Sequence, residues 1–91
     1  MSTMLFEVEQ TAWIAQNLPV VLVRMLDPQP FALGLAATLG GCLLSQVIEI
    51  PPSVRADGSP RVNLFAFALA DADQLERFLP GEVVELLPEG A

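Results

Sequence analysis

The amino-acid sequence predicts a small α+β domain with the element order βαββαβ, preceded by an N-terminal extension. Segments rich in β-branched and aliphatic residues alternate with short segments of helical periodicity, which indicates both kinds of element. Pairs of proline and glycine residues separate these segments. The length of 91 residues allows one domain, and a hydrophobic content of 53% is enough to fill a core.

The first half of the domain is predicted to be strand, helix and strand. Residues 20–26 (VVLVRML) have the β-branched content of a strand, and the prolines in residues 27–30 (DPQP) force a loop after it. Residues 31–39 (FALGLAATL) follow with helical spacing, and Gly40-Gly41 is placed to end the helix. Residues 42–50 (CLLSQVIEI) form the second predicted strand. The expected inward stripe of the helix is Ala32, Leu35, Ala36 and Leu39.

The second half is predicted to be strand, helix and strand again. Residues 53–60 (SVRADGSP) are a polar turn, so residues 42–50 and the third strand, residues 61–70, should pair as a hairpin with a long loop. Asp71 is a suitable N-cap for a helix over residues 71–79. Residues 82–87 (EVVELL) form the fourth strand.

This order is the split βαβ arrangement of the ferredoxin-like fold, a four-stranded antiparallel sheet with two helices on one face. In that fold the first and third strands are central and the other two lie at the edges, where polar residues prevent unwanted pairing. The polarity of the strands agrees with this placement. The two predicted edge strands carry Ser45, Gln46, Glu49, Glu82 and Glu85.

The termini lie outside the predicted βαββαβ domain, which spans residues 19–88. Residues 1–18 form an N-terminal extension and residues 89–91 a tail. Residues 4–9 alternate in polarity like a strand. Residues 10–18 are compatible with a short helix or with a continuation of that strand into a hairpin with the next one.

The expected open face of the sheet predicts a protein interface. Two helices cover only one face of a four-stranded sheet, so the other face would expose more large apolar side chains than a soluble monomer usually tolerates. The N-terminal segment, a second copy or a protein partner would have to cover it. The expected interface residues are Phe65, Phe67, Leu69, Val21, Val23, Met25 and Trp13.

The residue inventory argues against catalysis, and we expect no enzyme activity. The chain has no histidine, lysine or tyrosine, which removes the usual general bases and the Schiff-base amine. No metal site and no cofactor are expected, because a lone Cys42 cannot form a structural zinc site. That single cysteine, the absence of a signal-like N-terminus and the absence of a long apolar stretch lead us to expect a cytoplasmic protein rather than a membrane protein.

The charge disfavours nucleic acids as partners. Eleven acidic residues against four arginines give a net charge of −7, which repels a phosphate backbone. Phe65 and Phe67 occupy the kind of strand position on which RNA-binding sheets stack bases. Because of the negative charge, binding of single-stranded RNA ranks a distant third, behind the two functional hypotheses given at the end of this subsection.

Two segments resemble the ACT domains, a family of small βαββαβ regulatory modules. Residues 20–27 (VVLVRMLD) resemble the family's first strand and its acidic end, and residues 62–88 (VNLFAFALADADQLERFLPGEVVELLP) resemble its last three elements. The resemblance implies a homodimer that holds an amino acid or similar effector beside the loop after the first strand. It implies the ligand residues Asp27, Gln29, Pro30 and Phe31. The loop of ACT domains typically reads Asp, a variable residue, Pro and Gly. In this chain, counting from Asp27, the proline comes one position later, at Pro30, and Phe31 stands where the family has glycine.

Two functional hypotheses follow. The first is a non-catalytic ACT-like regulatory or assembly domain that self-associates through its sheet and binds a small effector. The alternative is an acidic protein–protein inhibitor or adaptor that has no small-molecule ligand.

Overall fold

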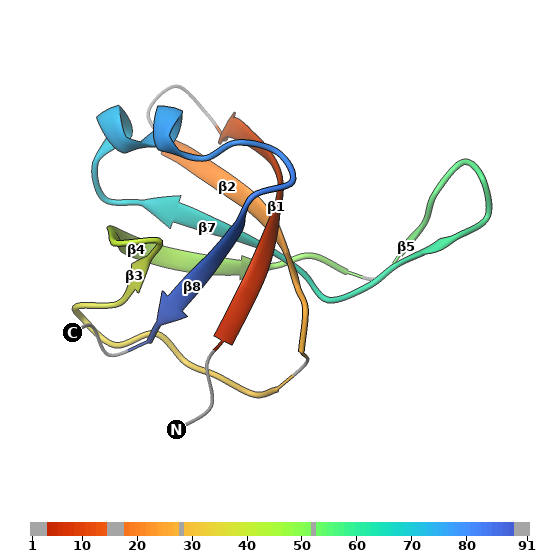
Figure 1. Ribbon diagram of the computed structural model, residues 1–91, viewed down its shortest axis with the longest axis horizontal. Coiled ribbons are helices and arrows are strands. Elements are labelled where there is room, and N and C mark those ends of the chain that lie inside the picture. The colour runs from red at the N-terminus through yellow and green to blue at the C-terminus, as the bar shows by residue number, and fades with distance from the viewer. Residues whose placement is uncertain (1–3, 15–17, 28, 52, 89–91) are drawn as a thin grey trace.

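The computed structural model describes residues 4–14, 18–27, 29–51 and 53–88, and it shows a closed antiparallel β-barrel (Figure 1). The strand order around the barrel is β1-β2-β7-β4-β3-β8, with β8 returning to β1. The barrel strands are β1 (Met4–Ile14), β2 (Leu18–Met25), β3 (Thr38–Leu39), β4 (Cys42–Glu49), β7 (Leu64–Leu69) and β8 (Val83–Leu87). The other elements are β5 (Ser53–Val54), β6 (Pro60–Arg61) and the 3₁₀ helix η1 (Ala72–Arg77).

The predicted ferredoxin-like α+β sandwich is therefore wrong, although its strands are mostly in place. As expected, β7 lies between β2 and β4. The difference is that β1 inserts between β2 and β8, which converts an open sheet into a barrel. The predicted helix over residues 71–79 is only the 3₁₀ helix η1, whose N-cap Asp71 accepts a hydrogen bond from the Asp73 amide at 3.0 Å.

The predicted helix over residues 31–39 is also wrong, because the segment is extended and turns once. Leu35 is 103% exposed, whereas Ala37 and Leu39 are both 0% exposed. Phe31 and Leu33 are half-buried against the core, so alternate residues face inward before and after the turn at Leu35. This is the period of an extended chain rather than of a helix.

Gly40 and Gly41 form a hairpin turn rather than a helix cap. Their φ angles are +58° and +86°, and the flanking residues Leu39 and Cys42 are partners in the β3–β4 ladder. Two residues with positive φ are the requirement of a type I′ turn, which suits tightly linked antiparallel strands. The glycine pair therefore reverses the chain and places β3 between β4 and β8.

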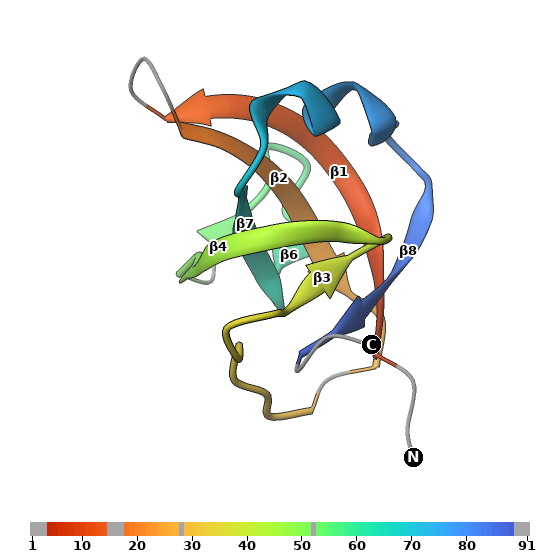
Figure 2. The same cartoon turned by 90° about the vertical axis from the view of Figure 1, so that its left-hand side faces the viewer.

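The N-terminal segment is a strand that continues into a hairpin, which confirms that alternative. β1 pairs with β2 from Phe6 opposite Met25 to Ile14 opposite Leu18. The register shifts at Glu9, where β1 carries one extra residue. Such a bulge bends a strand and increases its twist, and both strands curve strongly around the barrel (Figure 2).

The core fills the barrel interior with side chains from every barrel strand, as small barrels require. Phe6 is fully buried at its centre and meets Phe67 edge to face, with ring centroids 5.3 Å apart. Phe78, just after η1, is buried against the same cluster. The other fully buried large residues are Leu39, Leu64, Leu86, Val8, Val21, Val23 and Cys42.

A two-stranded arm, β5 and β6, projects from the barrel between β4 and β7 (Figure 1). Its turn is held by Asp57, which accepts hydrogen bonds from the Ser59 hydroxyl and amide at 2.6 and 2.9 Å. The Ser59 hydroxyl is the main reason that the pKa of Asp57 lies below its usual value.

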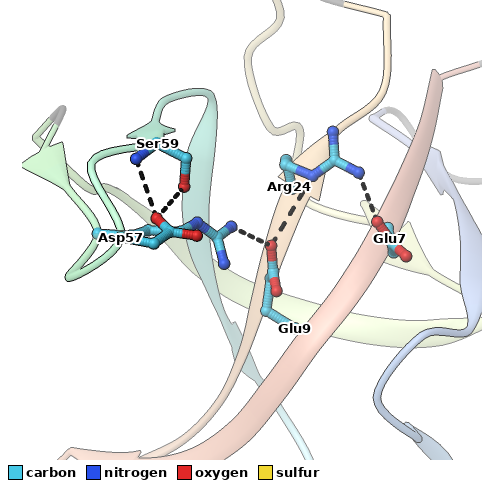
Figure 3. Close-up of polar contacts among 6 residues, drawn as sticks. Glu7, Glu9, Arg24, Asp57 and Ser59 are labelled. Atoms are coloured by element: carbon cyan, nitrogen blue, oxygen red, sulfur yellow. Dashed lines mark hydrogen bonds and ion pairs between the residues drawn. The ribbon is translucent and has the colours of Figure 1, made fainter.

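Ion pairs connect this arm to the barrel wall (Figure 3). Arg55 of the arm lies 3.5 Å from the carboxylate of Glu9, and Arg24 of β2 lies 3.8 Å from the same oxygen. Arg24 also pairs with Glu7 at 2.5 Å. The bulged residue Glu9 thus joins the arm to β2.

Leu35 and Leu39 would both be buried if residues 31–39 formed a helix, but in the barrel Leu39 is buried and Leu35 is exposed. Replacing Leu39 with alanine should lower the free energy of unfolding by about 2–5 kcal/mol, because the side chain is fully buried. Leu35→Ala should change it by less than about 0.5 kcal/mol, because Leu35 is fully exposed. Urea unfolding followed by circular dichroism measures both. Equal losses for the two variants would support the helix instead.

The ion pairs should hold the arm without stabilising the barrel. Arg55→Gln should accelerate amide hydrogen exchange in residues 53–61, while the free energy of unfolding changes by less than about 1 kcal/mol, as is usual for exposed ion pairs. Arg77→Gln, at the end of η1, is the matched control and should leave exchange in the arm unchanged. Unaltered exchange in the Arg55 variant would show that the ion pair does not restrain the arm.

Candidate ligand pocket

A pocket of about 410 Å³ lies between β4, β7 and the segment that follows β2. This volume is within the usual range for small-molecule and side-chain sites. Figure 2 shows the segment after β2 running below β4 at one end of the barrel. The residues that line the pocket are Gln29, Pro30, Phe31, Val47, Glu49 and Phe65.

Two neighbouring strands position one wall of the pocket. Glu49 of β4 lies directly opposite Phe65 of β7, and Val47 lies opposite Phe67. Directly paired residues project to the same face of a sheet. Phe67 points into the core, so Val47, Glu49 and Phe65 continue the inward face of the barrel up to its rim.

Phe31 adjoins this wall and is held by other aromatic rings. Its ring centroid lies 5.2 Å from that of Phe65 at an interplanar angle of 66°, and 5.9 Å from that of Phe6 at 80°. These edge-to-face contacts are favourable arrangements of aromatic pairs. The backbone amide of Gln29 donates to the Met25 sulfur at 3.3 Å, which joins the start of this wall to the end of β2.

Glu49 supplies the charge of the pocket. Its side chain is exposed at the rim, and among the described residues no ion pair engages it. Glu7 and Glu9 of β1 differ in this respect, since they are already paired with Arg24 and Arg55. The pocket therefore combines two aromatic rings with one carboxylate.

The structure brings together part of the predicted ligand set. Gln29, Pro30 and Phe31 line the pocket, while Asp27 is exposed and lies outside the lining. Phe65, predicted as an interface residue, also lines the pocket, beside Phe31.

Sequence reasoning missed Val47 and Glu49 as pocket residues. The available signal was their i, i+2 spacing, which places both on one face of a strand.

Most of the predicted interface residues are inside the barrel. Among the described strands, the side that was expected to need a partner faces the barrel interior instead of forming an open sheet face. Trp13 differs from this group, since it lies near the end of the β1–β2 hairpin, opposite Pro19, and is 53% exposed. The buried members are Val21, Val23, Met25, Phe67 and Leu69. Phe67, at 0% exposure, also offers no surface on which a base could stack.

The described residues contain no group of three or more histidine, cysteine or acidic side chains arranged to hold a metal ion. Cys42, the single cysteine, is buried in the core. None of the helical structure in the described ranges is long and apolar enough to cross a membrane.

Comparison with known proteins gives no match, whether to a family model, to a curated protein or to a solved structure. The ACT resemblance therefore has no independent support, and the barrel is not the fold that it implies.

Proposed function

We propose that this protein is a non-catalytic binding domain that takes an organic cation, the ammonium or guanidinium group of an amino acid or basic side chain, in the pocket beside Phe31. The observation that carries this proposal is the pairing of Glu49 with Phe65 across the two strands, with the Phe31 ring in edge-to-face contact with Phe65. Aromatic faces attract cations, and a carboxylate beside them adds a charged hydrogen-bond acceptor.

Charge over the whole molecule favours the same ligand class. At a net charge of −7 the protein attracts cations and repels anions. The four arginines are the only basic side chains, and two of them, Arg24 and Arg55, are paired with glutamates outside the pocket. Among the described residues the lining contains no basic side chain that would compete for Glu49.

The strength of these interactions limits the affinity for a lone cation. A cation on an aromatic ring contributes roughly 0.5–2 kcal/mol, and an exposed ion pair about 0.2–1 kcal/mol. A dissociation constant of about 1 mM requires about 4 kcal/mol. A small cation should therefore bind with a dissociation constant on the order of millimolar or weaker.

Titration with n-butylguanidinium tests the proposal, with the uncharged n-butylurea as a matched ligand. Amide signals of Gln29, Phe31, Phe65 and residues 47–49 should shift with butylguanidinium in two-dimensional NMR spectra and should hardly respond to butylurea, since only the cation gains from Glu49 and the rings. Equal responses to the two ligands, or no response at these residues, would contradict a cation site.

Two glutamate variants test whether butylguanidinium binds in the pocket. Glu49→Gln should weaken butylguanidinium binding about two- to five-fold, the worth of an exposed ion pair. Glu85→Gln, which removes an exposed carboxylate from β8 outside the pocket, makes the same change in net charge and should have a much smaller effect. If both variants weaken binding equally, the cation is attracted by the overall charge and not by this site.

A further inference from the structure

In the part of the chain that the structure describes, one side of β4 has no neighbouring strand along most of its length. Of the described β4 residues, β3 pairs with Cys42 and Leu43 alone, while β7 runs along the other side from Leu44 to Glu49. Among the described residues, no strand pairs with residues 45–49 on the side away from β7. An unpaired edge of this kind accepts an additional strand from another chain.

The hydrogen-bond pattern shows which residues of β4 face this open edge. The Ile50 amide donates to the Leu64 carbonyl at 3.1 Å. Bonded and non-bonded pairs alternate along an antiparallel ladder, so residues 48 and 46 also turn their backbone groups toward β7. Val47 and Glu49 then turn their amides and carbonyls toward the open edge.

Val47 and Glu49 are also the β4 residues whose side chains line the pocket. Their backbones thus present hydrogen-bond donors and acceptors at the open edge. Their side chains supply a carboxylate, from Glu49, and an apolar surface, from Val47, in the pocket beside that edge. A strand added antiparallel to this edge would place its residues opposite Val47 and Glu49, with their side chains on the pocket face.

We propose that the ligand of the pocket is an arginine side chain in an extended segment of a partner protein, which adds to the edge of β4 as an antiparallel strand. This inference rests on the proposed cation site and deepens it. The segment supplies the backbone hydrogen bonds that a free cation lacks, so its affinity exceeds that of the small molecule. Antiparallel addition continues the pattern of every ladder in the barrel.

Charge and geometry select arginine and exclude a second copy of this chain. The planar guanidinium stacks on aromatic rings and donates two parallel hydrogen bonds to a carboxylate, which suits Phe31, Phe65 and Glu49 better than an ammonium does. Two copies with a net charge of −7 each would repel one another at this edge.

Five-residue peptides with acetylated and amidated ends test this inference against the intact protein. The probe is Thr-Val-Arg-Val-Thr, and its first control replaces arginine with the uncharged citrulline. The arginine peptide should bind at least ten-fold more tightly than n-butylguanidinium and shift the amide signals of Val47 and Glu49 most strongly. The citrulline peptide should bind several-fold more weakly than the arginine peptide.

Backbone methylation of the peptide separates strand addition from simple side-chain binding. In the proposed register the amide of the arginine itself faces β4, while the amides of the two neighbouring valines face solvent. Methylating the arginine amide should weaken binding about five-fold or more, and methylating the amide of the following valine should change it less than two-fold. Equal effects of the two methylations would overturn the proposed pairing.

The outcomes distinguish the two proposals. If the peptide binds no more tightly than butylguanidinium and is insensitive to methylation, strand addition is wrong and the cation site stands. If neither ligand shifts the pocket signals, both proposals fail. If light scattering shows that the protein forms dimers and the β4 signals shift with protein concentration alone, the edge binds a second copy, which overturns the assignment to a basic segment.

Discussion

Closure of the barrel depends on β3, a strand of only two residues. Thr38 and Leu39 pair with Leu43 and Cys42 of β4 on one side and with Leu87 and Leu86 of β8 on the other. Without this pairing β4 and β8 would both be edges, and the sheet would be an open one. Leu39 is fully buried, so the same residue closes the ladder and fills the core.

The turn that follows β3 makes this closure possible. Gly40 and Gly41 both adopt positive φ, which side chains rarely tolerate. A Cβ on Gly40 would also approach the Val84 side chain to 3.3 Å. The two glycines therefore allow a tight reversal against β8.

Closure also positions the pocket. The segment between β2 and β3 must cross one end of the barrel to deliver β3, and Phe31 in that segment packs against Phe6, Phe65 and Phe67. Because β3 is short, residues 45–49 of β4 have no second strand partner among the described residues. The aromatic wall and the open edge thus both follow from the way in which the barrel is completed.

The longer strands could largely be predicted from the sequence, whereas β3 and the topology could not. Alternation and β-branched content located residues 42–49 and 83–87 correctly, because these local signals depend on side chains that face a core. Residues 31–39 were misassigned because two prolines, an apolar run and a glycine pair are compatible both with a short capped helix and with an extended crossing followed by a type I′ turn. Nine residues are too few for a helix to be stable without packing, so tertiary contacts decide between the two.

The candidate site could be predicted only in part. The loop residues Gln29, Pro30 and Phe31 came from a family resemblance whose implied fold the barrel contradicts, and they nevertheless line the pocket. Val47 and Glu49 could not be placed beside them, since that proximity depends on the segment after β2 crossing the barrel end. No local pattern encodes a contact of that kind.

The most direct test of barrel closure is a set of nuclear Overhauser contacts measured on the isotope-labelled protein. The barrel predicts cross-strand contacts between Leu39 and Leu86 and between Phe6 and Val84, which link β3 and β1 to β8. Finding these contacts, with extended-chain signals over residues 31–34, would support the account. Sequential helical contacts over residues 31–39 without any contact between Leu39 and Leu86 would contradict it.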